Sequence, residues 1–510
     1  MKRRVAIIDL GSNSVRLVVV EIGDGGSYHQ IEDIKESVRL AESLIDGKPL
    51  SAKVMHHAVE TIKLFVSLCQ ALEVQRIIPI ATAATRMASN QREFLDLLRQ
   101  ESGLDFRVLS GSEEAYYGYL GVANTVHVSN GVTIDVGGGS TQIVKFRDRK
   151  IVRDGNFPLG TILLTEQFQS HTAMSRSQLE SMLAFLREKF AAYPWLKTAG
   201  DLPVVGMGGA IRSLARIDRR RKGYLPDRTH DYVMTRQDVK EILEHLAGMD
   251  AGERRSVPGL SAERTDIIVA GVGLVYAMMQ EGEFDTLIAS GTGLRFGLLF
   301  EYLFPKAGDP LVPSVLMYSI DNMMRYYGLQ EDHARHVSNL ALSLFDQLRE
   351  VHGYGPTARR ILLVSSLLHD TGVGINYNDH DEHTLYLITR SRLNGLTHRE
   401  MIICAYVAAA HYRRFVWNGI DNYMAPKGPL QPQDIDMIKK LGIILRIANG
   451  LDRCSIKAVT FVNCIVKPDR VLVMAKIRRG AELEIRHAMS AAEEFEDLFN
   501  RKLEIEPINH

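Results

Sequence analysis

The stretch VTIDVGGGSTQIV, residues 132–144, places an acid, three consecutive glycines and two hydroxyls between two apolar segments. The apolar segments are expected to form a β-hairpin, with Asp135 at the end of the first strand and the glycines at the turn. A glycine turn exposes backbone N–H groups, which form an anion-binding concavity. A neighbouring carboxylate can hold Mg²⁺, an ion that prefers oxygen ligands and phosphate. Taken alone, the stretch fits an ordinary tight hairpin equally well.

A second hairpin of the same kind is expected at the beginning of the chain. The apolar run 4–10 leads into Asp9-Leu10-Gly11-Ser12-Asn13-Ser14, and an apolar segment resumes at residues 15–22. Strands then alternate with helical periodicity as far as about residue 305, which predicts an α/β fold. Two halves that both open with strand, Asp, Gly, hydroxyl and strand indicate an internal duplication. Their turns, facing each other across a cleft, could clamp one polyanion.

The composition describes a globular protein without a global charge bias. Of 510 residues, 45% are hydrophobic and 24% are charged, and lysine plus arginine equals aspartate plus glutamate at 61 each. Nothing global indicates a nucleic-acid or membrane partner, so a polyanion would have to be met by a local basic groove. The four cysteines lack a CxxC spacing, which argues against a zinc cluster or a disulfide framework. The first apolar run is interrupted by Asp9, so no signal peptide is expected and the protein is predicted to be cytoplasmic.

The pattern of the sequence divides the chain into four expected domains. The two α/β halves occupy residues 1–128 and 129–307. Helical periodicity without strand signals follows over residues 308–456, which predicts an all-α domain. Residues 457–510 return to strands with one helix and are expected to form a small α/β domain.

Five spaced motifs carry a family resemblance. They are DLGSNS at 9–14, SGSEEA at 110–115, DVGGGST at 135–141, GMGGAIRSLA at 206–215 and PGLSAERTD at 258–266. In this order they closely resemble the exopolyphosphatase / guanosine pentaphosphate phosphohydrolase (Ppx/GppA) family of the actin-like ATPase superfamily. The resemblance covers about the first 305 residues and implies a duplicated actin-like (ribonuclease H-like) α/β fold. It also implies a phosphoric anhydride hydrolase that uses Mg²⁺ or Mn²⁺.

The activity that the resemblance implies is release of terminal orthophosphate from inorganic polyphosphate, by attack of a water that a glutamate orients. One alternative is removal of the 5′-terminal phosphate of guanosine pentaphosphate (pppGpp). Another is non-catalytic binding of polyphosphate or of the alarmones pppGpp and ppGpp. By analogy with the family, a homodimer is expected.

The resemblance also assigns site residues in this sequence. Glu114 is the expected catalytic carboxylate, and Glu113 is either a supporting residue or a carboxylate that complements the helix N-terminus, where Ser112 is the expected N-cap. Asp9 and Asp135 are the expected metal ligands. Phosphate binding is expected from the two turns and one arginine: Ser12, Asn13, Ser14, Arg86, Gly137, Gly138, Gly139, Ser140 and Thr141.

Two further features allow two interpretations each. Gly208 and Gly209 match the nucleotide-base loop of the superfamily, although a close helix–strand contact is the favoured interpretation in a polyphosphatase. The basic run RSLARIDRRRK, residues 212–222, is either a path for a long polyphosphate or a solvated segment.

The sequence departs from the family pattern at two positions. Gln142 stands where the family usually has Glu, and a glutamine can orient water or donate to phosphate but cannot act as a base or an anionic metal ligand. Phe296 stands beside Arg295, where Glu is more usual. The first departure puts the mode of Mg²⁺ binding in question.

The helical segment carries a second set of metal-ligating residue types. His336, His369-Asp370 and Asp452 resemble, in order and helical setting, the HD phosphohydrolase superfamily, and His383 and His411 add two more imidazoles. Two histidines and two aspartates that converge in a helical bundle can hold a divalent metal for phosphate-ester hydrolysis. The alternative is a set that only stabilises the bundle through His–Asp hydrogen bonds. An HD-like domain with a second divalent metal is therefore expected.

Overall fold

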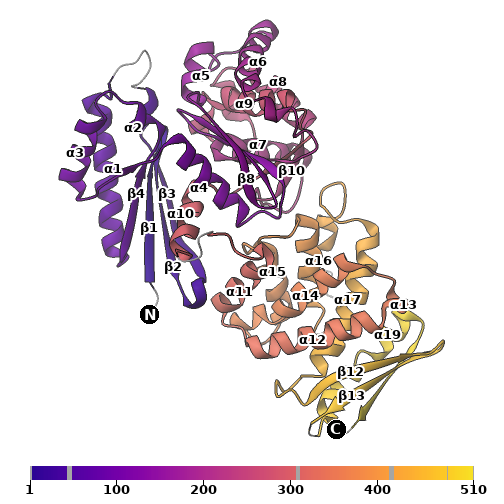
Figure 1. The fold of residues 1–510 in the computed structure, drawn as a ribbon. Coiled ribbons are helices and arrows are strands. Elements are labelled where there is room, and N and C mark those ends of the chain that lie inside the picture. The colour runs from indigo at the N-terminus through magenta and orange to yellow at the C-terminus, as the bar shows by residue number, and fades with distance from the viewer. Residues whose placement is uncertain (1–2, 43–48, 306–309, 413–418, 479, 509–510) are drawn as a thin grey trace. The chain divides into compact units, whose positions relative to one another are not determined.

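The protein is described here by a computed structural model, which covers residues 3–42, 49–305, 310–412, 419–478 and 480–508. The chain forms two compact units, Met1–Val315 and Leu316–His510 (Figure 1). Unit 1 contains two sheets flanked by helices, and unit 2 contains helices and one small sheet. The four domain boundaries expected from the sequence stay a prediction.

The first sheet of unit 1 has the strand order β3-β2-β1-β4-β5. Its strands are β1 (Arg3–Leu10), β2 (Ser14–Ile22), β3 (Tyr28–Ser37), β4 (Arg76–Ala81) and β5 (Arg107–Val108). The first three are antiparallel neighbours, whereas β4 and β5 run parallel to β1. Helices α1 (Ala52–Ala71) and α3 (Gln91–Ser102) pack their apolar residues on one face of this sheet (Figure 1).

The second sheet of unit 1 has the order β10-β11-β9-β6-β7-β8. Its strands are β6 (Gly131–Val136), β7 (Thr141–Arg147), β8 (Lys150–Phe157), β9 (Val204–Met207), β10 (Tyr232–Thr235) and β11 (Thr286–Ala289). The helices that share its core are α5 (Thr161–Phe168), α6 (Arg176–Ala191), α7 (Gly208–Lys222), α8 (Arg236–Ala247) and α9 (Ile268–Glu281). Helix α9 is buried along almost its whole length, which explains its continuous apolar sequence.

The two sheets confirm the predicted duplication. The run β3-β2-β1-β4-β5 corresponds to β8-β7-β6-β9-β11, with antiparallel hairpins first and parallel strands afterwards. The two turns also have the same hydrogen bond, from Gly11 N to Ser14 O at 3.1 Å and from Gly137 N to Ser140 O at 3.0 Å. The equivalence therefore extends to single residues of the two turns.

Each half contributes a helix to the region between the sheets. Helix α4 (Gly111–Ala123) follows β5 of the first sheet but packs against β6, β7 and β8 of the second. Helix α10 (Leu294–Leu303) follows β11 and packs against α4 and β1. The N-terminus of α4, which carries Glu114, is thereby brought close to both hairpin turns.

Unit 2 has one continuous hydrophobic core shared by helices and strands. The helices are α11 (Val315–Tyr327), α12 (Glu331–Gln347), α13 (Arg349–His352), α14 (Pro356–Leu368), α15 (His380–Arg390), α16 (His398–Ala409), α17 (Pro432–Gly450), α18 (Glu482–Met489) and α19 (Ala492–Phe499). The strands β12 (Val459–Val466), β13 (Arg470–Ile477) and β14 (Lys502–Ile508) form a sheet in that order. Among the described residues, no helix is long and apolar enough to cross a membrane.

Candidate active site

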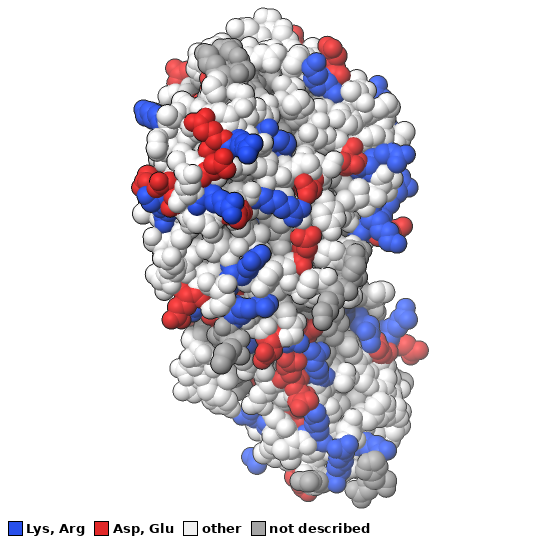
Figure 2. All heavy atoms as spheres, turned by 60° about the vertical axis from the view of Figure 1, so that its left-hand side comes forward, with Lys and Arg blue, Asp and Glu red and all other residues white. Residues whose placement is uncertain are grey.

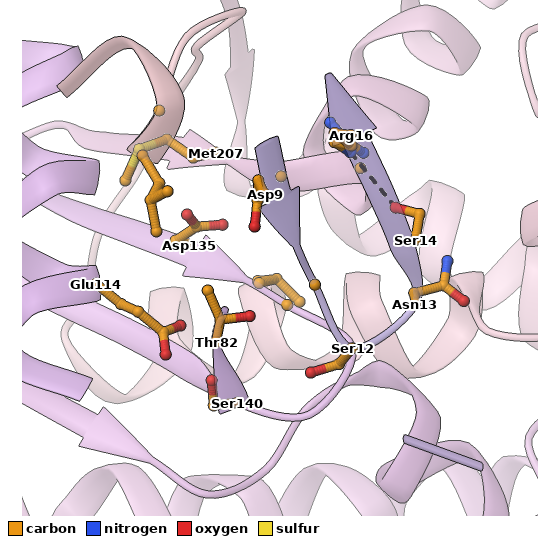
Figure 3. A pocket seen from close by; sticks show the side chains of 18 of the residues that line it. Asp9, Ser12, Asn13, Ser14, Arg16, Thr82, Glu114, Asp135, Ser140 and Met207 are labelled. Carbon is orange, nitrogen blue, oxygen red and sulfur yellow. Dashed lines mark hydrogen bonds between the residues drawn. The ribbon is translucent and has the colours of Figure 1, made fainter. Parts of the chain in front are cut away.

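A cavity of about 160 Å³ lies where the two hairpin turns meet helix α4. The carboxylates of Asp9 and Asp135 point toward each other there, and the Glu114 side chain enters from the α4 side (Figure 3). The predicted residues that line the cavity are Asp9, Ser12, Asn13, Ser14, Glu114, Asp135, Gly137, Gly138, Gly139 and Ser140. The structure therefore brings ten of the predicted residues into one cavity.

The two turns approach each other closely enough to require glycine in one of them. A Cβ atom at Gly139 would lie 2.8 Å from the Ser12 Oγ atom of the opposite turn, and one at Gly138 would lie 3.2 Å from the Ser12 Cβ atom. The Ser12 hydroxyl accepts a hydrogen bond from Ala84 N at 3.1 Å, which holds the first turn against the segment after β4. The close approach gives both turns access to the same ligand.

The three carboxylates of the cavity lie close enough to repel one another. Burial and the Asp9 carboxylate raise the pKa of Asp135 to about 6, against the opposing effect of Arg212 and Arg16. Burial also raises the pKa of Asp9, and Arg295 and Arg16 oppose that shift. A divalent cation between these groups would relieve their repulsion. Mg²⁺ is typically held by one or two carboxylates together with waters and substrate phosphate oxygens, so Asp9 and Asp135 fit this ion.

Glu114 combines burial with a single charged partner. Its carboxylate accepts a hydrogen bond from the Arg86 guanidinium, which also donates to Leu109 O. Burial raises the pKa of Glu114 to about 7, an effect that Arg86 opposes and that Asp135 and Asp9 add to. A carboxylate with a pKa near neutrality can accept a proton from water. Arg86, predicted to bind phosphate, does not line the cavity and instead orients Glu114.

Ser112 has a different place from the one predicted, whereas Glu113 fits the second of its two interpretations, a carboxylate at the helix N-terminus. The N-cap of α4 is Ser110 and not Ser112, because Ser110 and Glu113 form a capping box. The Ser110 N–H and hydroxyl and the Arg107 guanidinium lower the pKa of Glu113 to about 2. Glu113 does not line the cavity, and its partners are those of a helix cap. Thr141 is likewise buried beneath the turn, where its hydroxyl donates to Leu159 O at 2.8 Å.

Four arginines line the cavity together with the carboxylates, and sequence reasoning considered only Arg212 among them, as part of a possible polyphosphate path. They are Arg16, Arg212, Arg264 and Arg295. Burial and Arg295 lower the pKa of Arg16 to about 10, and burial, Arg16 and Arg295 hold the pKa of Arg212 well below its usual value. Among the described residues, Arg212 has no hydrogen-bond or ion-pair partner. Converging guanidinium groups of this kind fit an anion with several negative oxygens.

Close contacts, one of them with Arg264, explain the two glycines at the start of α7. A Cβ atom at Gly209 would lie 1.9 Å from the Arg264 guanidinium carbon. Gly208 has a φ of +92°, and a Cβ atom there would lie 2.8 Å from Val136 O. These contacts favour close packing as the reason for both glycines.

Gln142 occupies the position in the second hairpin that Arg16 occupies in the first. Asp9 pairs with Arg16 across β1 and β2, and Asp135 pairs with Gln142 across β6 and β7. The Gln142 amide donates to Ser140 Oγ at 2.8 Å and to Asn156 Oδ1 at 2.9 Å. Gln142 thus orients the Ser140 hydroxyl of the second turn.

Gln142→Glu is expected to make stability depend on Mg²⁺. The variant loses two hydrogen bonds and buries a further negative charge, so its free energy of unfolding without metal should fall by about 1–3 kcal/mol. The added carboxylate is a hard oxygen ligand, so Mg²⁺ should restore the loss. Melting temperatures in chelator and in a Mg²⁺ series would test this. Gln142→Met, which cannot ligate Mg²⁺, is the control, and equal rescue of both variants would contradict the expectation.

Phe296 makes apolar contacts beside the cavity. Its ring packs edge-on against Tyr28 of β3 at 6.3 Å between centroids. The adjacent Arg295 pairs with Asp33 of the same strand at 2.7 Å. The acid expected beside Arg295 is therefore supplied by β3, a strand that the sequence analysis did not predict.

The basic run of α7 is not one continuous cationic path. Arg212 faces the cavity, Arg219 pairs with Asp227, and Arg221 and Lys222 both pair with Asp218. On the face drawn in Figure 2, lysine and arginine side chains are interspersed with aspartate and glutamate. Arg212 is the residue of this run that lines the cavity.

The second predicted metal set in unit 2 needs correction. His336 Nε2 donates a hydrogen bond to Val459 O at 2.8 Å, and His336 lies outside the cluster. His333, three residues earlier in α12, takes its place beside His369 and Asp370. Likewise His380, and not His383, joins His411 and Asp370. Asp452 pairs with His333 Nδ1 at 2.8 Å.

A duplicated actin-like α/β fold with a cavity of glycine turns, carboxylates and arginines defines a phosphoryl-transfer class of protein. Comparison with protein-family models gives matches to the Ppx/GppA phosphatase family over residues 18–305 and to Ppx/GppA phosphatase, domain III, over residues 315–487. The chain belongs to the Ppx/GppA phosphatase family, and it is a hydrolase of that family.

Three relatives illustrate the similarity. A guanosine-5′-triphosphate,3′-diphosphate pyrophosphatase of Aliivibrio fischeri is 28% identical over 402 residues, which is 78% of each chain. The crystal structure of the Aquifex aeolicus family member matches with 28% identity and a TM-score of 0.52, covering 60% of this chain and 99% of that one. An exopolyphosphatase structure from Cytophaga hutchinsonii has a TM-score of 0.55 at 22% identity over 59% and 98% of the chains, which shows the shared fold.

Proposed function

We propose that the protein is a Mg²⁺- or Mn²⁺-dependent exopolyphosphatase that releases terminal orthophosphate from inorganic polyphosphate. The observation that carries the proposal is the cavity in which four arginines face three carboxylates around two glycine turns. Arginines that repel one another without a ligand are stabilised by a polyanion. The proposed location is the cytoplasm, and the proposed assembly is a homodimer.

In the proposed mechanism the protein positions groups and neutralises charge. The turn amides and the arginines hold the terminal phosphates, and Glu114 orients a water in line with the bridging oxygen. The water oxygen bonds to phosphorus as the bridging P–O bond breaks, and Glu114 accepts the water proton. The shortened polyphosphate leaves with the bridging oxygen. A divalent ion at Asp9 and Asp135 would neutralise charge on the transferred group.

The second candidate is hydrolysis of the 5′-terminal phosphate of pppGpp. It is supported by the Aliivibrio fischeri relative, whose name specifies a guanosine pentaphosphate pyrophosphatase. The same carboxylates and arginines would act on either terminal phosphoryl group.

Phosphate release would distinguish these functions. Purified protein with Mg²⁺ should release orthophosphate from polyphosphates of several lengths, and Glu114→Ala should abolish the release. Faster release from pppGpp than from polyphosphate would favour the second candidate. Tight binding of either compound without turnover by the wild type would overturn both and favour a sensor.

Arg212→Gln is expected to raise KM for polyphosphate about 10–100-fold, with a smaller effect on kcat, because one charge-assisted contact to a phosphate is worth about 1.5–3 kcal/mol. Stability should not fall, since Arg212 has no partner among the described residues to lose. Steady-state kinetics and a melting curve measure both effects. Arg220→Gln changes an exposed arginine of the same helix and should leave KM near wild type. An unchanged KM in Arg212→Gln would contradict the binding role.

A further inference from the structure

Three ion pairs join strand β3 and the residues after it to the second half of unit 1. They are Asp33–Arg295 at 2.7 Å, Arg39–Asp266 at 2.8 Å and Lys35–Glu263. Arg295 itself lines the cavity. The two acids of the second half stand on either side of Arg264, which also lines the cavity. All three pairs therefore end at or beside a cavity arginine.

The register of the first sheet places these side chains on the cavity side. Lys35 lies opposite Arg16, and Asp33 lies opposite Val18, across β2 and β3. Side chains two residues apart on a strand share one face, so Asp33 and Lys35 lie on the face that carries Arg16. Like charges directly opposite each other on neighbouring strands repel, and the Glu263 carboxylate beside Lys35 offsets this repulsion.

Arg39 connects one of these ion pairs with the first hairpin turn. Its backbone N–H donates to Asn13 O at 3.0 Å, and Ala41 N donates to Ser12 O at 3.0 Å. Arg39 has a φ of +48°, a left-handed conformation that residues other than glycine rarely adopt. Such a conformation persists where the surrounding contacts hold it. Arg39 thus binds the turn through its backbone and Asp266 of the second half through its side chain.

The segment that carries Arg264 contacts both halves of unit 1. Its short helical turn, Ala262–Arg264, has no side-chain cap. Arg254 attaches the segment to the second half through Thr265 O at 3.0 Å. Ile267 is buried in the hydrophobic core of the first half. The ion pairs on either side of Arg264 add directional contacts to this apolar one, so they set where Arg264 lies relative to the first turn.

Stability does not account for these pairs. The side chains of Asp33, Arg39 and Glu263 are 38%, 36% and 45% exposed. Exposed ion pairs contribute little to the free energy of unfolding. Their geometry matters more, because a guanidinium binds phosphate oxygens strongly only within a narrow range of distance, about 2.7–2.9 Å. A small displacement of Arg264 or Arg295 would therefore weaken binding of a polyanion.

We propose that three residues of the first half position two arginines of the second half for polyanion binding. The three are Asp33, Lys35 and Arg39, and the two arginines are Arg264 and Arg295. The three residues do not line the cavity, so they act through the arginines. The inference rests on the proposed function, because it gives these residues a part in binding the terminal phosphates of polyphosphate.

Steady-state kinetics of the full chain with polyphosphate and Mg²⁺ test this role. Arg39→Gln and Lys35→Gln should each raise KM about 3–10-fold and change kcat less than about twofold, because a displaced binding group weakens contacts to the substrate. Their melting temperatures should fall by less than about 4 °C. Glu42→Gln is the matched control, since Glu42 pairs with Arg39 at 2.8 Å but belongs to the same half. Its KM should stay near wild type.

A charge exchange separates position from the loss of a side chain. Lys35→Glu brings two carboxylates together and should raise KM about 10-fold or more. Adding Glu263→Lys restores an ion pair of opposite polarity and should bring KM back to within about threefold of wild type. A double variant no better than Lys35→Glu would overturn the proposal. An unchanged KM in Arg39→Gln and Lys35→Gln would overturn it as well.

Hydrogen exchange of the ligand-free protein distinguishes failure of this inference from failure of the proposed function. The backbone amides of residues 258–267 should exchange faster in Lys35→Glu than in wild type, and the charge exchange should restore slow exchange. If the wild type releases no phosphate from polyphosphate, the proposed function fails, and hydrogen exchange still decides whether Lys35 positions the Arg264 segment. Wild-type exchange rates in Lys35→Glu would overturn that positioning.

Discussion

Glu114→Gln is expected to lower kcat for phosphate release about 10²–10⁴-fold, the usual contribution of a positioned general base. Glutamine has the shape of glutamate and can still accept a hydrogen bond from Arg86, so the variant should fold. It cannot accept the proton of the attacking water. Initial rates with saturating polyphosphate and Mg²⁺ measure the effect. Glu113→Gln, whose amide can still serve in the capping box, is the matched control and should retain most of the activity.

The pH profile provides an independent test of the same role. Burial raises the pKa of Glu114 to about 7, so the carboxyl is protonated below that pH and cannot act as a base. The kcat/KM of the wild type should therefore rise as pH increases through about 7 and level off above it. The residual activity of Glu114→Gln should lack this rise. An identical acid limb in the variant would assign the titration to another group.

The phosphate-binding turns could be predicted because the sequence repeats itself. Asp9 and Asp135 are each followed by glycine and hydroxyl residues between strands, and the chain folds both segments into hairpins with the same turn hydrogen bond. The same repetition also contained Arg16, which lies seven residues after Asp9 as Gln142 lies seven after Asp135. Arg264 stands inside the motif PGLSAERTD, and Arg295 lies beside Phe296, one of the two departures from the family pattern. Their convergence depends on the packing of α9, α10 and the two sheets, which local patterns do not encode.

Several strands were not predicted because few of their side chains are buried. Strand β8 exposes almost all of its residues, and β3 carries charged and polar residues along most of its length. The apolar alternation that identifies a half-buried strand is therefore absent at these edges. Strand β3 supplies Asp33, the ion-pair partner of Arg295. Because this strand was not predicted, the ion pair beside the cavity was not predicted either.

The predicted metal-ligand set of unit 2 shows how helical spacing limits a prediction. His333 and His336 are three residues apart on α12, and His380 and His383 are three apart on α15. Residues at that spacing are neighbours on one helix surface, so the sequence does not distinguish which of them points inward. The packing of α12 against α14 and α17 places His333, rather than His336, beside Asp370 and Asp452.

The second large effect is expected at Arg254, which is 0% exposed in unit 1. Its guanidinium donates to Leu246 O at 2.8 Å, Ser170 O at 2.9 Å, Thr265 O at 3.0 Å and Thr172 O at 3.1 Å. These carbonyls belong to three separate segments, so one side chain joins them. The Thr265 contact also fixes the residue that follows Arg264, whose side chain lines the cavity.

Arg254→Met should therefore lower the free energy of unfolding of unit 1 by about 3–5 kcal/mol, because it leaves several buried carbonyls without donors. Arg254→Lys should recover only part of the loss, since an ammonium group cannot reproduce the planar fork of donors. Unfolding in urea can be followed by the fluorescence of Trp195, which lies in unit 1. The measurement uses a Trp417→Phe background, so that Trp195 is the one tryptophan left.

Arg255→Met is the control for this measurement, because Arg255 is the exposed neighbour of Arg254 and should leave the unfolding midpoint near wild type. The functional consequence follows from the same contacts. If Arg254 holds the Arg264 segment in place, the folded fraction of Arg254→Lys should show a raised KM for polyphosphate even where it remains stable, with kcat changed less. Loss of stability with an unchanged KM would mean that the Arg264 segment is positioned independently of Arg254. An unfolding midpoint equal to that of the wild type in Arg254→Met would contradict the inference that Arg254 stabilises unit 1 by joining three segments.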